Sequence, residues 1–156
     1  MVNQSYLLRK GRCSIANQIY LVTCCCHQRK THFLRMQFTK IIINELFYSD
    51  HLEFSKTYAM VVMPDHLHWL FQLNRKLDLS QLIGRIKANT SRNIHKFSPE
   101  ADRIWQTNFH DRAIRSEERV EAAIKYVINN PVRAGLVKSI YDYPYWYALN
   151  TKGSPL

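Results

Sequence analysis

The segment from Thr57 to Leu73 is almost entirely apolar and is interrupted at Pro64-Asp65. Proline followed by aspartate favours a turn, so this segment predicts two strands joined as a hairpin. Side chains of a strand point alternately to its two faces. In the second strand one face is therefore wholly apolar and the other carries two histidines; the faces consist of Leu67, Trp69, Phe71 and Leu73, and of His66, His68, Leu70 and Gln72.

The rest of the chain shows strand and helix periodicity in turn. The predicted elements are a strand over Ile19 to Cys26, helices over Gln37 to Tyr48 and Ser80 to Phe97, a strand around His110 to Arg115, and a helix capped by Ser116. That last helix must stop near Asn129-Asn130-Pro131, because proline cannot continue a helical ladder. The order predicts an α+β fold, a ferredoxin-like βαββαβ sandwich with an antiparallel sheet and an extra C-terminal helix that carries a tyrosine.

The extra helix has two polar residues beside its apolar stripe. At 100° per residue, Tyr126 lies about 110° from the centre of the core stripe, and Asn130 projects from nearly the same flank. If the helix crosses the free sheet face, the phenol and the carboxamide can meet His66 and His68. The alternative is that Tyr126 packs at the core boundary and Asn130 caps the helix before proline.

Histidines at i and i+2 of a strand share a face and can hold one divalent metal ion. With an amide oxygen they form a sparse ligand set, which leaves positions for substrate oxygens. A divalent ion there would polarise a phosphate, and a tyrosine oxygen is a competent nucleophile for phosphoryl transfer. Imidazole usually suits zinc better than magnesium, so the residues leave the metal open. Each histidine can instead be a hydrogen-bonded structural residue.

Charge points to a polyanionic partner. The 156 residues make one domain's worth of chain, 1–156, with a net charge of +10 and a pI near 9.6. In a cytoplasmic protein this balance favours nucleic acid. Polar positions of the second helix form a stripe that is either a track for the DNA backbone or a solvated face; they are Arg85, Asn89, Arg92 and Lys96.

Neither a membrane span nor a secretion signal is expected. The apolar runs fall short of the ~20 residues that cross a bilayer, and the basic start of the chain lacks an apolar segment after it. We expect a soluble, cytoplasmic, nucleoid-associated protein without membrane contact. The four cysteines fit no CxxC zinc pattern and are expected to be small buried residues of a reduced compartment. A zinc site of Cys24, Cys26 and His27 is the alternative.

Three segments resemble a known family. MPDHLHWLF resembles the HUH motif of single-tyrosine transposases, in which a hydrophobic residue separates two histidines. WQTNFHDRAIR, followed by AAIKYVINNPVRAGLV, resembles the fourth strand and the tyrosine helix of REP-associated tyrosine transposases. YLLRKGR resembles the opening segment of these proteins. The resemblance runs from about Arg9 to Trp146.

The resemblance implies a metal-dependent endonuclease and strand transferase for single-stranded DNA. Tyr126 matches the nucleophile, which keeps the 5′ end of the DNA as a phosphotyrosine. His66, His68 and Asn130 match the ligands of a divalent metal, Mg²⁺ or Mn²⁺. Position 130 is not a second tyrosine, so one covalent link per site is implied.

The implied substrates are hairpins of repeated DNA with a tetranucleotide beside the hairpin foot. An N-terminal arm, residues 1–12, would help to read the tetranucleotide, with candidate contacts Tyr6, Arg9, Lys10 and Arg12. Relatives work as monomers or as homodimers, which leaves both states open here.

Two other functions fit the residues. The protein can bind structured single-stranded nucleic acid without cutting it, or it can be a zinc hydrolase with a third ligand such as His110 or Asp111. The C-terminal tail, 141–156, is expected to be less regular. Its tyrosines either pack or stack on bases; they are Tyr141, Tyr143, Tyr145 and Tyr147.

Overall fold

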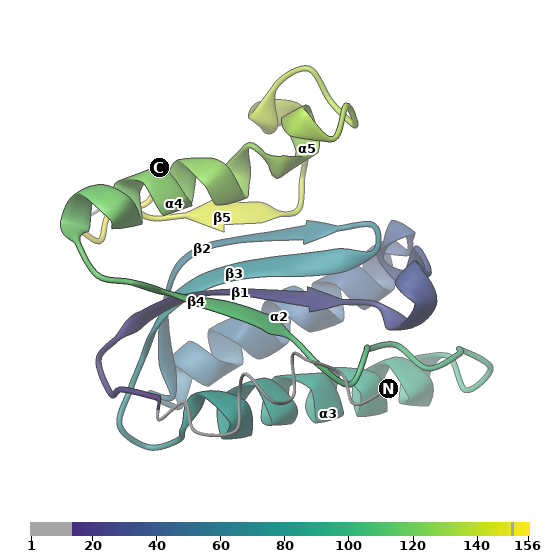
Figure 1. Cartoon of the computed structure of the whole chain (residues 1–156). Helices are drawn as coiled ribbons and strands as arrows, with labels where there is room; N and C mark the ends of the chain where they lie inside the picture. The colour runs from purple at the N-terminus through teal and green to yellow at the C-terminus, as the bar shows by residue number, and fades with distance from the viewer. Residues whose placement is uncertain (1–13, 151) are drawn as a thin grey trace, which may run out of the picture.

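The computed structural model describes residues 14–150 and 152–156, and in this part of the chain an antiparallel five-stranded sheet forms the centre (Figure 1). Its order is β4-β1-β3-β2-β5. The strands are β1 Ile19–Cys25, β2 Ser55–Met63, β3 His66–Leu73, β4 His110–Ile114 and β5 Trp146–Ala148. The helices of four or more residues are α2 Met36–His51, α3 Leu79–Phe97, α4 Glu117–Ile128 and α5 Asn130–Arg133.

The first four strands with α2 and α3 form the ferredoxin-like sandwich that the sequence predicts. Helices α2 and α3 cover one face of the sheet, and α4 crosses the other (Figure 1). We refer to these as the α2/α3 face and the α4 face. The hairpin has the predicted two-residue turn, since β2 ends at Met63 and β3 begins at His66.

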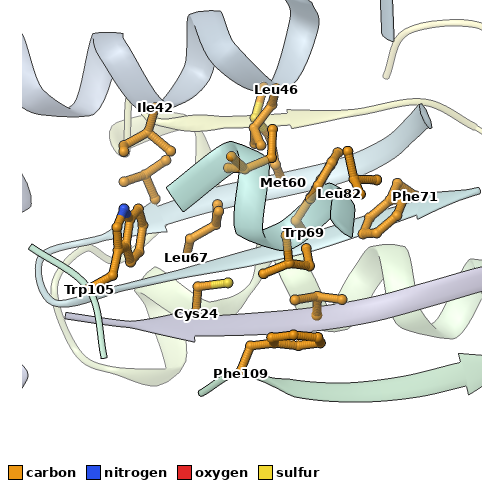
Figure 2. Close-up of a cluster of buried hydrophobic side chains, with 14 of the residues drawn as sticks. Cys24, Ile42, Leu46, Met60, Leu67, Trp69, Phe71, Leu82, Trp105 and Phe109 are labelled. Atoms are coloured by element: carbon orange, nitrogen blue, oxygen red, sulfur yellow. The ribbon is translucent and has the colours of Figure 1, made fainter. Parts of the chain in front are cut away.

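The α2/α3 face is covered by the larger core. It buries the apolar face of β3 against both helices, and Figure 2 shows part of it. Trp69 and Trp105 donate their indole N–H groups to Thr57 Oγ1 and Thr90 Oγ1, at 2.9 Å each. Because the two polar N–H groups are satisfied, the two large rings can be buried at little polar cost.

Helix α4 builds a second, smaller core on the opposite face. Its apolar stripe packs on β2 and β3 through Val120, Ala123, Ile124 and Val127. Ser116 caps the helix as expected, because its Oγ accepts the Arg119 N–H at 3.3 Å. The helix ends at Ile128, just before the predicted Asn-Asn-Pro stop.

The C-terminal tail is more regular than expected. Its residues 146–148 form β5, which pairs with β2 through Val61–Trp146 and Ala59–Ala148. Tyr143 anchors the approach to this strand by donating its phenol to the Val62 carbonyl at 2.6 Å. Sequence reasoning missed β5 because it is three residues long and has no hydrophobic alternation.

The four tail tyrosines differ in their surroundings. Tyr143, Tyr145 and Tyr147 are partly buried, and Tyr147 packs edge-on against Phe47. Tyr141 is 83% exposed and lies beside the Trp146 ring. Packing therefore accounts for three of the tyrosines, and Tyr141 has a ring that solvent can reach.

The helices in the described ranges give no sign of a membrane span. None of them is both long enough and apolar enough to cross a bilayer.

Phe71 tests the larger core. Its side chain is fully buried, so Phe71→Ala should lower the free energy of unfolding by about 3–5 kcal/mol. Leu34, which is 70% exposed, supplies the control, because Leu34→Ala should change stability by less than about 0.5 kcal/mol. Urea denaturation followed by circular dichroism measures both. Similar losses in the two variants would contradict this assignment of the core.

Candidate active site on the α4 face

His66, His68 and Tyr126 form one cluster of rings on the α4 face. The two imidazole centroids lie 4.8 Å apart, and the His68 centroid lies 5.7 Å from the Tyr126 ring. His68 is buried, whereas Tyr126 is 38% exposed, so a substrate can reach the phenol. The structure thus brings together the strand pair and the helix tyrosine, which are about sixty residues apart in sequence.

Each histidine is held through Nδ1. His66 Nδ1 lies 2.6 Å from Asp65 Oδ1, and His68 Nδ1 lies 2.8 Å from Thr23 Oγ1. Thr23 is placed opposite His68 by the β1–β3 register. A ring nitrogen fixed in this way orients the imidazole and leaves Nε2 to bind a ligand, which is the usual arrangement of metal-binding histidines.

Arg29 supports the histidine pair from the segment after β1. It donates from Nε to Asp65 Oδ2 and from Nη1 to Cys25 Sγ, at 2.9 Å each. Burial acts to raise the pKa of Asp65, but its bonds with His66 and Arg29 outweigh burial, and the pKa lies below its ordinary value. The carboxylate therefore stays charged and holds His66 in place.

The turn that carries Arg29 is strained. Gln28 and Arg29 both have φ of 54°, in the left-handed region that side chains with a Cβ rarely adopt. Such strain persists where the surrounding contacts fix it, and it is frequent at functional sites. Here the contacts are those of Arg29 with Cys25 and Asp65.

Asn130 bonds the end of helix α4 with its side chain and also faces His68. Pro131 has no N–H for the Val127 carbonyl, and Asn130 Nδ2 donates to that carbonyl at 3.3 Å and to the Tyr126 carbonyl at 2.9 Å. With Nδ2 committed to the helix, Oδ1 is the atom left for a cation or for the His68 ring. Asn130 can therefore bond the helix end and face His68 at once, but the C-cap of α4 is Asn129 and not Asn130, as the alternative interpretation expected.

The surroundings of His68 favour its neutral form. Burial, together with the charges of His66, Arg133 and Arg29, lowers its pKa to about 4, although a hydrogen bond with Asn130 acts in the opposite direction. Neutral imidazole is the form that binds metals. His68 is therefore ready to bind a metal at neutral pH without first losing a proton.

The donors present fit a weakly held divalent ion. They are the Nε2 atoms of His66 and His68 and the amide oxygen of Asn130, a set that leaves most of a six-coordinate shell to water or substrate oxygens. Within the described ranges no group of three or more His, Cys, Asp or Glu side chains is placed to hold a metal ion. His110 and Asp111 therefore do not complete a hydrolytic zinc site with the histidine pair.

The cysteines do not form the alternative zinc site either. Cys24 and Cys26 are buried in the core of the α2/α3 face, and Cys25 is buried on the α4 face. Burial, followed by the charge of Asp65, raises the pKa of Cys26 to about 12, which opposes the thiolate that zinc binds.

The predicted DNA-backbone residues lie away from the cluster. Arg85, Arg92 and Lys96 are exposed on α3, on the other side of the sheet. Arg85 stacks on Phe54, with 5.1 Å from its Cζ to the ring centre. The N-terminal candidates lie outside the described residues; they are Tyr6, Arg9, Lys10 and Arg12.

Four site residues were missed from the sequence, and two of them carried a signal. Asp65 directly precedes His66, and Arg133 follows Tyr126 by seven residues, which is two helical turns. The Arg133 Cζ indeed lies 4.8 Å from the centre of the Tyr126 ring. Thr23 and Arg29 reach the site from β1 and its following turn, which only the sheet register shows.

The pKa of His68 predicts a pH dependence of stability in the metal-free protein. In the unfolded chain the His68 imidazole binds a proton below pH about 6.5, whereas in the native state it stays neutral down to about pH 4. The free energy of unfolding should therefore fall as the pH drops through this window, and His68 should contribute about 3 kcal/mol of the loss by pH 4.

Urea titrations at pH 7 and pH 4, with a chelator present, measure the effect. The His68→Gln variant should lose about 3 kcal/mol less than the parent protein over the same interval. Equal losses in the two proteins would show that His68 titrates with its ordinary pKa.

Similar folds occur among solved structures. The structure described as "Structure of the REP associates tyrosine transposase bound to a REP hairpin" matches with a TM-score of 0.73 at 24% identity, over 86% of this chain and 79% of that one. A crystal structure of a transposase-like protein of Deinococcus radiodurans matches with a TM-score of 0.53 at 16% identity, over 77% of this chain and 95% of the other. These likenesses support the ferredoxin-like fold.

Curated relatives match over part of their length. The "REP-associated tyrosine transposase" of Escherichia coli is 31% identical over 88 residues, 56% of this chain and 50% of the relative. The "Putative REP-associated tyrosine transposase" of Haemophilus influenzae is 29% identical over 106 residues, 62% of this chain and 60% of the relative. The chain thus spans about half to three fifths of the curated relatives it matches.

A family model covers most of the described structure. The model described as "Transposase IS200 like" matches residues 14–130, a range that runs from the residues before β1 to Asn130. It includes the histidine pair, Tyr126 and the amide ligand candidate. The chain therefore belongs to the IS200-like transposase family.

Proposed function

We propose that the protein is a metal-dependent endonuclease and strand transferase for single-stranded DNA, which works through a covalent 5′-phosphotyrosine. The observation that carries this proposal is the ring cluster of His66, His68 and Tyr126 on one sheet face. Membership of the IS200-like transposase family supports it, as do the names of the curated relatives.

Tyr126 supplies the nucleophile in this proposal. Its phenolic oxygen attacks the scissile phosphorus, the bond from phosphorus to the 3′ oxygen breaks, and that oxygen leaves with the electron pair. The phenol proton passes to solvent, and the leaving oxygen takes up a proton to become a 3′ hydroxyl. One phosphodiester is exchanged for another, so a later attack by a 3′ hydroxyl can rejoin DNA.

His66, His68 and Asn130 are the proposed ligands of Mg²⁺ or Mn²⁺. An ion bound there would polarise the scissile phosphate and neutralise charge that develops in the transition state. The chain's own part is to hold the donors in place: Asp65 and Thr23 fix the two rings, and the helix carbonyls fix the amide.

The proposed substrates are DNA hairpins of repeated sequence with an adjacent tetranucleotide. A structural relative is described as bound to a REP hairpin, and this chain carries a net charge of +10. The N-terminal arm would read the tetranucleotide. Backbone phosphates would contact the basic residues of α3 only if the DNA extends from the α4 face to the other side of the sheet; these residues are Arg85, Arg92 and Lys96.

The proposed site makes one covalent link at a time. Tyr126 is the only tyrosine of α4, and position 130, one turn later, is asparagine. A monomer and a homodimer both fit this proposal, as does association with the nucleoid.

Replacing the nucleophile tests the reaction. Tyr126→Phe keeps the ring that packs against His68 but removes the attacking oxygen. The covalent adduct with a hairpin labelled on the 3′ side of the cut should disappear, while hairpin affinity should stay within about threefold. A denaturing protein gel, with Mn²⁺ or Mg²⁺ in the reaction, detects the adduct as a protease-sensitive labelled band.

Tyr48→Phe is the matched control, because Tyr48 is half exposed on α2, away from the site. This variant should form adduct as the parent protein does. Adduct formation by Tyr126→Phe at the parental level would refute the proposal. Tight hairpin binding without any adduct in either metal would favour a protein that binds structured DNA without cutting it.

The metal ligands are tested separately from the nucleophile. His68→Ala removes one of two imidazole donors and should reduce metal-dependent cleavage about 100-fold or more. His51→Ala changes an exposed histidine on α2 and should cleave normally. Titration with Mn²⁺, followed by electron paramagnetic resonance, should show weaker binding only in the first variant. Unchanged Mn²⁺ affinity would remove His68 from the ligand set.

A further inference from the structure

Arg133 lies against the proposed nucleophile. Its guanidinium carbon is 4.8 Å from the centre of the Tyr126 ring, a distance typical of cation–π contact. Its positive charge also helps to lower the pKa of His68, so it is felt at the histidine pair. A guanidinium is therefore part of the cluster that contains the phenol and the imidazoles.

The backbone around Arg133 holds the side chain in this position. Helix α5 restarts the helical path at Asn130, with Pro131 in its first turn. It ends at Arg133, and Gly135, two residues later, has a φ of 72° that glycine adopts readily and that lets the Leu136 N–H bond the Pro131 carbonyl at 2.9 Å. The Arg133 N–H bonds the Asn129 carbonyl at 2.9 Å, which ties it to the end of α4.

The charge of Arg133 is available to a substrate. Arg29 and Lys125 are paired with Asp65 and Glu121, respectively. Arg133 has no such ion pair with a carboxylate among the residues that the structure describes, and its side chain is exposed. A planar guanidinium matches the oxygens of a phosphate group in two parallel hydrogen bonds.

We propose that Arg133 is a catalytic residue that binds the scissile phosphate beside Tyr126 and stabilises the negative charge on its oxygens during the attack. This inference rests on the proposed function. A phosphate that approaches the exposed phenol also approaches the guanidinium on the ring's face. Positive charge fixed in advance at a reacting phosphate is a large source of rate enhancement.

A packing role makes a different prediction. If Arg133 only stacked on Tyr126 to orient the ring, a flat uncharged side chain would replace it. If it binds phosphate, charge is required. The substitutions Arg133→Lys, Arg133→Gln and Arg133→Ala separate these roles, because lysine keeps the charge and glutamine keeps a planar group without charge.

The first measurement is the single-turnover rate of adduct formation at saturating hairpin DNA with Mn²⁺. Arg133→Ala and Arg133→Gln should be slower by about 100-fold, and Arg133→Lys should recover part of the rate. Arg119→Ala removes an exposed arginine from the first turn of α4 and should react at the parental rate. A parental rate in Arg133→Gln would reduce Arg133 to a packing role, and a parental rate in Arg133→Ala would overturn the proposal.

The second measurement does not depend on cleavage. In the Tyr126→Phe background, hairpin binding is measured over a series of salt concentrations. Loss of one phosphate contact in single-stranded DNA should reduce the slope of log affinity against log salt by about 0.7 in Arg133→Ala. Arg119→Ala, in the same background, controls for the change in net charge, and an unchanged slope in Arg133→Ala would overturn the phosphate contact.

The two measurements separate this inference from the proposed function. A parent protein that forms no adduct would refute the nuclease, and the salt slope would still decide whether Arg133 binds phosphate. Adduct formation at the same rate in the parent protein and in Arg133→Ala would confirm the nuclease and refute the inference.

Discussion

The position of β3 between β1 and β2 is the constraint on which both the fold and the site depend. With both edges paired, β3 has one permitted register, in which Leu67, Trp69 and Phe71 enter the larger core. Alternation then forces His66 and His68 onto the opposite face, beneath α4. A slip of one residue would exchange the two sets and bury both imidazoles among aromatic and aliphatic side chains. The burial of Trp69 thus fixes the register of β3, and this register also places the two histidines on the α4 face.

Much of the fold could be predicted because strong local patterns agree with it. The alternation of β3, the Pro64-Asp65 turn and the Ser116 cap each identify an element without knowledge of its neighbours. Strand β5 has no such pattern. Its three residues become a strand only because β2 offers an unpaired edge and the Tyr143 phenol anchors the approach. Tertiary pairing of that kind cannot be derived from local periodicity.

The site was predictable where chemistry and spacing coincide along one element. Helical spacing places Asn130 beside Tyr126, and strand alternation pairs the histidines. The supporting residues come from elsewhere: Thr23 and Arg29 are 45 and 36 residues from their partners and meet them only through the sheet. The basic stripe of α3 was predicted to be exposed, and it is, but it lies on the other side of the sheet from the ring cluster. A periodic charge pattern indicates which helix face is exposed and does not indicate on which sheet face the helix lies.

Helices α4 and α5 are separated by one turn residue, Asn129, whose N–H bonds the Lys125 carbonyl of α4 and whose carbonyl accepts the Arg133 N–H of α5. The segment from α4 to α5 consequently carries Tyr126, Asn130 and Arg133 together. A tilt of this segment away from the sheet would move the phenol, the amide and the guanidinium away from the histidine pair together. The proposed site would therefore lose all three groups at once. Two copies that exchanged this segment would each receive all three groups, so a monomer and an exchanged dimer would contain proposed sites of the same composition.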